Sequence, residues 1–325
     1  MKAIVVSEPG GPENLGIADV PAPELGPGKL LVNVRATALN RADLLQRRGL
    51  YPPPRGESEV LGMECSGEVA ELGEGVGSFR VGDRVMALLP GGGYAEQVVV
   101  PEKMAIPMPA GMSFTDAAAI PEAFLTAREA LFTLGRTRAD DVVLVHAAGS
   151  GVGSAAVQVA REAGARVVAT AGSAEKLARV GELGAHVLVN YRTDDFVEAV
   201  KKESSGRGAN VILDFIGASY WPKHAACLAV GGRCVCIGVL GGASAEVNLA
   251  QLLMRRYQLL GLVMRARDVS EKIAITQAFI RETLPLFEKG RLHPVVDKVF
   301  RLDQATEAHQ RMESNENFGK IVLTT

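Results

Sequence analysis

A glycine-containing turn between a predicted strand and a predicted helix is the clearest chemical signal in this sequence. The strand covers residues 142–146, the helix covers residues 152–163, and the seven residues AAGSGVG (147–153) connect them. Glycines at such a turn let the backbone approach a pyrophosphate, and the amino end of the helix stabilises its negative charge. Ala148 and Ser150 replace the first two glycines of the usual Gly-x-Gly-x-x-Gly spacing. The position of the turn in a series of alternating strands and helices nevertheless predicts dinucleotide binding.

The end of the next strand indicates which dinucleotide binds. In an NAD site an acidic residue usually stands there and binds the ribose 2′-hydroxyl. Here residues 170–173 read Thr-Ala-Gly-Ser, Lys176 follows in the next turn, and Tyr191 and Arg192 close the third strand. Small residues, a cation and a hydroxyl suit a 2′-phosphate, which a carboxylate would repel. We therefore expect NADPH, with the alternative that Lys176 is only a solvated helix residue.

Other reactive side chains do not have the spacing of a metal site. The four cysteines are Cys65, Cys227, Cys234 and Cys236. They are too few and too unevenly spaced for a disulfide framework, and we interpret Cys227, Cys234 and Cys236 as small buried residues. His146 ends an apolar strand, so we expect a hydrogen-bonded core residue rather than a catalyst. Arg265 and Arg267 follow the last strand of the series, where we expect a solvated loop.

Composition and charge describe an ordinary globular chain of about two domains. Of 325 residues, 47% are hydrophobic and 22% are charged. A net charge of −2 without runs of like charge argues against nucleic acid or an anionic membrane as the main partner. Met1–Val6 reads as a strand rather than a signal peptide, and no apolar window is long enough to span a bilayer. We expect a cytoplasmic protein.

The elements that must position these residues change in character along the chain. Up to about residue 120, short β-branched segments alternate with glycine, proline and aspartate turns, which predicts a β-rich domain. Its expected strands cover residues 30–34, 66–72, 83–88 and 96–100, and a capping box at Ser113 predicts a short helix.

From about residue 140, strands that are apolar throughout alternate with helical patterns. The expected strands cover residues 142–146, 166–171, 187–189, 211–215, 234–237 and 259–263. This alternation predicts an α/β fold with a doubly wound parallel sheet. The segment after residue 263 predicts a helix over 269–289, a strand over 295–300, a helix over 304–313 and a terminal strand. These elements could return to the first domain, so we expect a discontinuous two-domain chain.

Blocks of sequence from end to end carry a family resemblance. The chain resembles the medium-chain dehydrogenase/reductases of the quinone oxidoreductase (zeta-crystallin-like) family, and within it the tumour-suppressor-inducible quinone oxidoreductase group. Several blocks in the same order are more specific than one glycine motif. They are Gly10–Leu15, Ala38–Leu44, Leu88–Gly93, Ile120–Ala123, Ser150–Gly153, Thr170–Ser173, Ile216–Trp221 and Asn317–Val322.

The resemblance implies a fold and a set of cofactor contacts. A Rossmann domain (residues 122–262) would be inserted into a GroES-like catalytic domain (residues 1–121 and 263–325). Ser150, Gly151 and Val152 would lie under the pyrophosphate. Residues around the 2′-phosphate would be Gly172, Ser173, Lys176 and Tyr191. The residues at the nicotinamide end would be Gly238, Leu240 and Gly241, and further contacts would come from Tyr51, Thr126, Leu262, Met264 and Lys320.

Many relatives with this fold are zinc alcohol dehydrogenases, which need a thiolate and an imidazole as ligands. Their first cysteine would fall at Asn40, and their Gly-His-Glu motif falls at Gly62-Met63-Glu64. Neither first ligand is present, and the four-cysteine structural lobe is absent as well. We therefore expect no metal.

Asn40 and Tyr51 are the polar candidates for contact with a substrate. A quinone or an enone accepts hydride because the product oxyanion is delocalised, and nearby polar groups add to its stabilisation. Tyr51 begins a stiff Tyr-Pro-Pro-Pro segment. We hypothesise that Tyr51 hydrogen-bonds the cofactor or substrate and that Asn40 orients the substrate carbonyl. The alternatives are that Asn40 braces a turn and that Tyr51 packs at the rim of the cleft. For Asp43 two interpretations are open: it contacts the cleft, or it caps a helix three residues after Asn40.

These observations together predict an enzyme, a zinc-independent NADPH:quinone oxidoreductase. The alternatives are an NADPH-dependent enone or alkenal reductase, an enoyl-thioester reductase, and an NADPH-binding structural or regulatory protein. The resemblance also implies that the edge strand near Leu259–Val263 pairs with a second subunit, so we expect a homodimer. Neither nucleic acid nor a membrane is expected as a partner.

Overall fold

One unit of the fold is inserted into the other along the chain. The computed structural model describes residues 1–325, and they form a split unit (Met1–Leu125 with Met264–Thr325) and an inserted unit (Thr126–Val263). The first division falls within helix α3 (Pro121–Arg128), whereas the expected boundary lies at the start of that helix. A continuous helix presents no turn or composition change at the division, so the sequence pattern could not mark it.

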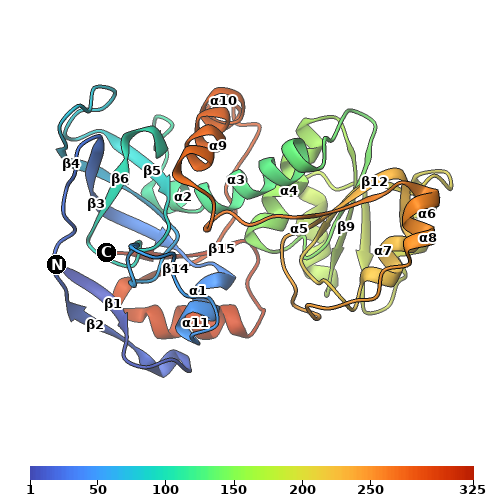
Figure 1. Cartoon of the computed structure of the whole chain (residues 1–325), viewed down its shortest axis with the longest axis horizontal. Helices are drawn as coiled ribbons and strands as arrows, with labels where there is room; N and C mark the ends of the chain where they lie inside the picture. The colour runs from blue at the N-terminus through green and yellow to red at the C-terminus, as the bar shows by residue number, and fades with distance from the viewer. The chain divides into compact units, whose positions relative to one another are not determined.

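The inserted unit contains a six-stranded parallel sheet, as the alternating pattern predicts. Its strand order is β10-β9-β8-β11-β12-β13, and every pair in it is parallel. Figure 1 labels β9 and β12 of this sheet. In chain order the strands are β8 (Val142–Val145), β9 (Arg166–Ala171), β10 (Val187–Asn190), β11 (Ala209–Asp214), β12 (Leu228–Cys236) and β13 (Gln258–Gly261). The strand order reverses between β8 and β11, which is where doubly wound sheets bind ligands at the carboxyl ends of their strands.

Helices connect these strands and bury the faces of the sheet. They are the π-helical turn η3 (Glu129–Leu134), α4 (Gly151–Glu162), α5 (Ala174–Glu182), α6 (Phe196–Glu203), α7 (Trp221–Cys227) and α8 (Leu249–Arg255). Phe196 of α6 and Trp221 of α7 pack with Leu144 and Ile212 of the sheet in one apolar cluster. Because β8 is buried along its whole length, its sequence is apolar at every position.

The split unit contains a seven-stranded sheet to which both ends of the chain contribute. Its order is β14-β15-β3-β4-β5-β7, with β6 also paired to β3, and a separate hairpin joins β1 to β2. The strands are β1 (Lys2–Val6), β2 (Leu15–Asp19), β3 (Lys29–Ala38), β4 (Glu64–Leu72), β5 (Arg84–Leu88), β6 (Gln97–Pro101), β7 (Ala105–Pro107), β14 (Val296–Arg301) and β15 (Lys320–Thr324). β15 pairs antiparallel with β3, so the carboxyl-terminal segment returns to the first domain as expected.

The split unit has two helices where the sequence pattern predicts one. The segment expected as one helix over 269–289 forms α9 (Val269–Glu282) and α10 (Leu284–Glu288). Pro285 has no N–H group to donate and its ring clashes with the preceding turn, so α9 ends before it. The other helices are α1 (Arg41–Arg47), α2 (Phe114–Ala118), α3, α11 (Ala305–Glu313) and the short turns η1 (Pro12–Asn14), η2 (Glu102–Met104) and η4 (Leu302–Gln304). None of the helices is both long and apolar enough to cross a bilayer.

Candidate functional site

The glycine turn of the inserted unit brings β8 and the amino end of α4 into close contact. Ser150 caps α4, since its Oγ accepts a hydrogen bond from the Gly153 amide at 3.0 Å. A Cβ atom at Gly153 would lie 2.2 Å from the carbonyl oxygen of Ala147, so only glycine fits there. The first turn of α4 therefore packs against the turn that follows β8. Its amide groups have no partners within the helix, which is the arrangement that holds a pyrophosphate.

The residues expected around a 2′-phosphate come together at the ends of β9 and β10. A Cβ atom at Gly172 would lie 2.5 Å from the Tyr191 hydroxyl oxygen, so the phenol lies directly over this glycine. Ser173 caps α5 by accepting a hydrogen bond from the Lys176 amide at 3.3 Å, which places Lys176 in the first turn of that helix. No carboxylate replaces the small residues at the end of β9.

Two loops at the carboxyl ends of β11 and β12 hold each other in place. The Gly241 amide donates to the Ile216 carbonyl at 2.6 Å, and the Leu240 amide donates to the Phe215 carbonyl at 3.2 Å. The Asp214 carboxylate accepts hydrogen bonds from the Ile216 and Gly217 amides. These bonds give the segment from Gly238 to Gly241 a defined path beside the switch point of the sheet.

Thr126 has an unsatisfied buried hydroxyl. Its Oγ1 atom is inaccessible to water and has no hydrogen-bond partner in the protein. Buried hydroxyls almost always have a partner, because leaving one unpaired costs about 1–3 kcal/mol. A polar group of a bound cofactor would satisfy it. Two further residues expected to contact the cofactor, Leu262 and Met264, are buried apolar residues.

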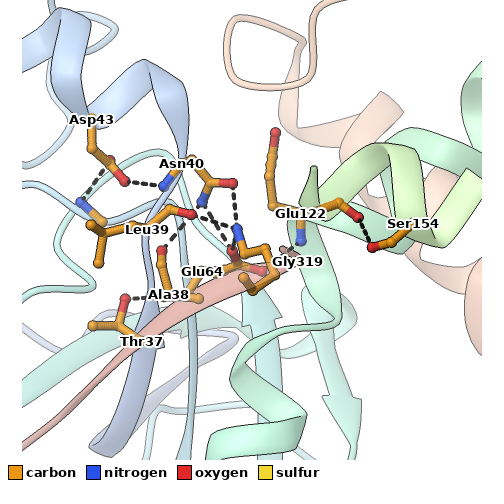
Figure 2. Close-up of polar contacts among 12 residues, drawn as sticks. Thr37, Ala38, Leu39, Asn40, Asp43, Glu64, Glu122, Ser154 and Gly319 are labelled. Carbon is orange, nitrogen blue, oxygen red and sulfur yellow. Dashed lines mark hydrogen bonds and ion pairs between the residues drawn. The ribbon is translucent and has the colours of Figure 1, made fainter. Parts of the chain in front are cut away.

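Asn40 and Glu64 form a buried polar cluster in the split unit (Figure 2). The Asn40 amide nitrogen donates to Glu64 Oε1 at 2.9 Å and to the Ala38 carbonyl at 3.3 Å. The Asn40 amide oxygen accepts from Lys320 Nζ at 2.6 Å. Both N–H bonds of the side chain are thus given to protein acceptors. These bonds favour the alternative that Asn40 braces the turn before α1.

Lys320 is the cation of this cluster. Its ammonium group donates to Glu64 Oε1 at 2.6 Å, to Asn40 Oδ1 at 2.6 Å and to the Leu39 carbonyl at 2.7 Å. The three N–H bonds of the ammonium are therefore occupied, and a cofactor contact would require Lys320 to give up one of them. Glu64 was not among the expected site residues. Its place in the Gly62-Met63-Glu64 segment was the signal that could have identified it.

Asp43 lies completely buried at the start of α1. Its carboxylate accepts hydrogen bonds from the backbone amide of Asn40 at 2.7 Å, from the backbone amide of Gly62 and from the Tyr94 hydroxyl. Burial raises the pKa of this carboxyl to about 6, against the opposing effect of these donors. The helix-capping interpretation of Asp43 is confirmed, because its carboxylate closes the first turn of α1.

Tyr51 is half-buried, and its hydroxyl makes no hydrogen bond within the protein. Burial raises the pKa of the phenol above its ordinary value, and the Arg265 guanidinium opposes that effect. The expectation that Arg265 lies in a solvated loop is wrong. This side chain is 5% exposed and donates hydrogen bonds to three oxygen atoms of the split unit, which replace water around its charge.

A chain of buried polar side chains crosses the sheet of the inserted unit. His146 Nδ1 lies 3.0 Å from Thr170 Oγ1, and His146 Nε2 lies 2.9 Å from His224 Nε2. His224 Nδ1 lies 3.6 Å from Asp214 Oδ2 and 3.9 Å from Cys234 Sγ. The expectation that His146 is a hydrogen-bonded core residue is confirmed. Asp214, His224 and Cys234 have donor atoms within 4.8 Å of one another, a cluster that the sequence spacing did not indicate.

Two family models match the chain. The model described as an alcohol dehydrogenase GroES-like domain matches residues 26–110, within the split unit. The model described as a zinc-binding dehydrogenase matches residues 151–278, which begin with the first residue of α4. Both halves of the expected architecture therefore have a counterpart among known families.

Curated proteins and solved structures are similar over nearly the whole chain. A quinone oxidoreductase of Pseudomonas aeruginosa is 33% identical over 325 residues, with 99% of each chain covered. The synaptic vesicle membrane protein VAT-1 homolog of Danio rerio is 36% identical over 93% of this chain, which spans only 65% of that relative's length. A crystal structure of an NAD-dependent alcohol dehydrogenase superimposes with a TM-score of 0.89 at 37% identity, covering 100% of both chains.

Proposed function

The chain belongs to the medium-chain dehydrogenase/reductase superfamily, in the quinone oxidoreductase-like family, and on this premise we propose that it is a zinc-independent NADPH:quinone oxidoreductase. Membership makes it a nicotinamide-dependent oxidoreductase. The preference for NADPH and for quinones is the proposal. The observation that carries it is the close approach of the Tyr191 hydroxyl to Gly172, beside the first turn of α5 that contains Lys176, with no acidic residue at the end of β9.

The residues present fit a nicotinamide dinucleotide phosphate. The close approach of α4 to Ala147 and the unpartnered hydroxyl of Thr126 are both features that a bound cofactor would use. We assign the pyrophosphate to Ser150, Gly151 and Val152. The 2′-phosphate is assigned to Gly172, Ser173, Lys176 and Tyr191, and the nicotinamide end to Gly238, Leu240 and Gly241. Further contacts are assigned to Tyr51, Thr126, Leu262 and Met264.

Bound NADPH supplies a hydride, and the residues of this chain bind, orient and protect the reactants. Tyr51 offers a hydroxyl that no protein group occupies. Because burial raises its pKa, the phenol stays protonated at neutral pH and can donate a hydrogen bond to an oxygen that becomes negative. Asn40 contributes by holding the Lys320–Glu64 pair in place. Direct contact between Asn40 and a substrate carbonyl would require it to exchange one of its present bonds.

We propose zinc independence from the side chains that stand where a catalytic zinc site would have its ligands. The oxygen atoms of Asn40, Glu64 and Leu39 surround the Lys320 ammonium, so a protein cation already compensates the carboxylate there. The thiolate and imidazole of a catalytic zinc site are replaced by Asn40 and Met63. A metal-free enzyme would keep full activity after exhaustive treatment with chelator, and loss of activity that zinc restores would overturn this part of the proposal.

An NADPH-oxidation assay with several acceptors tests the proposed function. The acceptors are naphthoquinones, phenanthrenequinone, simple enones and an enoyl thioester, with cofactor binding measured separately by NADPH fluorescence. We expect the highest kcat/KM with a quinone, and Tyr51→Phe should lower it. Faster turnover of an enone or enoyl thioester would favour those reductase activities. Tight NADPH binding without any turnover would favour a structural or regulatory role.

We also propose that the chain forms a homodimer in the cytoplasm through the edge of the inserted unit. β13 is the edge strand of the parallel sheet, and large apolar side chains near it are exposed. They are Leu249, Leu253 and Met254 of α8 and Leu259 of β13. A second copy would cover the unpaired edge and these side chains together. The four cysteines are free, as a reducing compartment would keep them.

A further inference from the structure

Arg265 is a buried cation that joins three separate segments of the split unit. Its Nε donates to the Pro90 carbonyl at 2.6 Å, its Nη1 donates to the Tyr51 carbonyl at 3.3 Å, and its Nη2 donates to Gln46 Oε1 at 2.7 Å. The planar guanidinium holds its donors in a fixed fork, which sets the relative positions of the acceptors. Arg265 therefore acts as a cross-link between α1, the Tyr51 segment and the loop that follows β5.

The bond to Gln46 extends the cross-link to the far end of the Tyr51 segment. Gln46 Nε2 donates to the Glu59 carbonyl at 2.9 Å, so one glutamine connects Arg265 to residues 51–59 from the other side. This segment forms neither helix nor strand, and its backbone is therefore not held by a regular hydrogen-bond ladder. Its two ends are held by Arg265 and Gln46.

The glycine loop after β5 provides the surface against which the segment packs. The Gly92 amide donates to the Val60 carbonyl at 2.8 Å. A Cβ atom at Gly91 would lie 2.6 Å from the Ser58 carbonyl oxygen and 3.6 Å from Arg265 Nη2. The close approach of the two segments therefore requires glycine at this position, and it places the guanidinium beside them.

Arg265 contacts the ring of Tyr51 as well as its backbone. The central carbon of the guanidinium lies 5.3 Å from the centroid of the phenol ring, within the range of a cation–π contact. The phenol hydroxyl has no protein partner of its own. The guanidinium therefore orients the Tyr51 ring by contact with the ring face, and the phenol hydroxyl remains available for a hydrogen bond to another molecule.

We infer that Arg265 is the positioning residue for Tyr51: it holds the backbone and ring of this tyrosine so that the phenol is ordered before substrate arrives. The inference rests on the proposed role of Tyr51 in the reaction. An ordered donor costs no reorganisation when charge develops on the substrate, which is the general basis of electrostatic preorganisation. Misplacement of such a group by about 1 Å costs up to about a hundredfold in rate.

Substitutions at Arg265 and Tyr51 form a double-mutant cycle that tests this inference. Arg265→Lys keeps the positive charge but loses the planar set of guanidinium donors. Arg265→Met keeps much of the side-chain volume but loses both the charge and the donors. We expect each to lower kcat about tenfold with little change in the dissociation constant of NADPH, and to have no further effect in a Tyr51→Phe background. Arg281→Met is the matched control, because Arg281 lies exposed on α9 and pairs only with Glu282.

Two measurements on the protein alone give readouts that do not depend on activity. Hydrogen exchange of residues 51–59 should be faster in both Arg265 variants and unchanged in Arg281→Met. The Tyr51 phenol, isolated by subtracting the spectrum of Tyr51→Phe, should titrate at higher pH in Arg265→Met, because the cation that lowers its pKa is removed. Gln46→Leu removes one acceptor of the guanidinium and should give a smaller effect of the same kind.

The outcomes separate this inference from the proposed function. If Tyr51→Phe keeps full activity, the role of Tyr51 is wrong, and the exchange and titration results still show whether Arg265 orders the tyrosine. Unchanged exchange and unchanged titration in the Arg265 variants would overturn the inference. An equal loss of kcat in the wild-type and Tyr51→Phe backgrounds would also overturn it, because Arg265 would then act through another group.

Discussion

At the scale of single residues, the buried charges of the split unit have the largest energetic consequences. Lys320 and Glu64 are almost completely buried, and Asn40, the Leu39 carbonyl and the Glu122 backbone amide satisfy their remaining polar atoms. Two charges taken out of water are tolerated only when each compensates the other and the hydrogen bonds are complete. The cluster is therefore sensitive to removal of either charge.

Replacing Lys320 by methionine should destabilise the split unit by about 3–5 kcal/mol, because Glu64 is left buried without a counter-charge. Chemical denaturation followed by circular dichroism measures this. Trp221, the only tryptophan, lies in the inserted unit, and its fluorescence should report an unchanged transition there. Lys2→Met is the control, because the Lys2–Asp19 pair is exposed to water and contributes little to stability. Equal effects of the two substitutions would contradict the prediction.

The second prediction at this scale concerns Lys176 and the choice of cofactor. A charge-assisted hydrogen bond to a 2′-phosphate contributes about 1.5–3 kcal/mol, so Lys176→Ala should weaken NADPH binding about 10- to 100-fold. NADH binding should stay unchanged, because NADH has no phosphate there. Fluorescence titration with both cofactors measures the two constants. Lys201→Ala, which removes a lysine paired with Glu198 on α6, is the control. Equal affinity of the wild-type protein for both cofactors would disprove NADPH specificity.

At the scale of elements, the contact between β8 and α4 depends on one glycine. Gly153→Ala would place a methyl group 2.2 Å from the Ala147 carbonyl oxygen, a backbone atom that cannot move freely. We expect a loss of about 1–3 kcal/mol in stability of the inserted unit and at least tenfold weaker NADPH binding, since the amino end of α4 must shift. Trp221 fluorescence and cofactor titration measure the two effects. Gly77→Ala, in open space, is the control, and normal binding by Gly153→Ala would refute the proposed pyrophosphate site.

At the scale of the whole molecule, buried histidines should make the two units respond differently to acid. In the inserted unit, burial lowers the pKa of His146 and His224 below the ordinary 6.5. In the split unit, burial lowers the pKa of His309 to about 3, while it raises the pKa of Asp43 from 3.8 to about 6. Below pH 6.5 each unfolded histidine binds a proton that the folded state excludes, whereas below pH 6 folded Asp43 binds a proton that the unfolded state releases.

The inserted unit should therefore lose stability as the pH falls from about 6.5, by up to about 1.4 kcal/mol per pH unit for each histidine. In the split unit the contributions of His309 and Asp43 nearly cancel between about pH 6 and 4.5. Denaturation midpoints measured across this pH range distinguish the two units. Trp221 fluorescence reports the inserted unit, and circular dichroism reports the whole chain. His224→Gln should make the midpoint measured by Trp221 fluorescence less dependent on pH, even if it changes the stability of the inserted unit at every pH. A flat fluorescence midpoint in the wild-type protein would contradict the prediction.

The proposed homodimer is the second prediction at the molecular scale. Leu253 is 76% exposed on α8, close in sequence to the unpaired edge strand β13. Leu253→Glu should place a charge in the interface and convert the dimer to a monomer at micromolar concentrations, as measured by light scattering. Val81→Glu is the control, because Val81 is also exposed, at 64%, but lies in the split unit. A wild-type monomer, or a Leu253→Glu dimer, would disprove the interface.

The order of elements was predictable from the sequence because local pattern is enough to specify it. Strands buried on both faces are apolar at every position, and their alternation with helices permits few topologies. The place of the glycine turn, Gly172, Lys176 and Tyr191 after the carboxyl ends of parallel strands was also predictable, and their contact with a cofactor stays a prediction. The break between α9 and α10 could have been read from Pro285.

The sequence by itself determined the fold class and the inserted arrangement of the chain. Only the tertiary structure decided the surroundings of the buried charges. Lys320 meets Asn40 across 280 residues of chain, and Arg265 meets Tyr51 across 214. No local pattern distinguishes a solvated arginine from one that donates to three distant oxygens. The identity of those acceptors depends on which loops the fold of the split unit brings together, and a long-range contact of this kind leaves no periodic trace in the sequence.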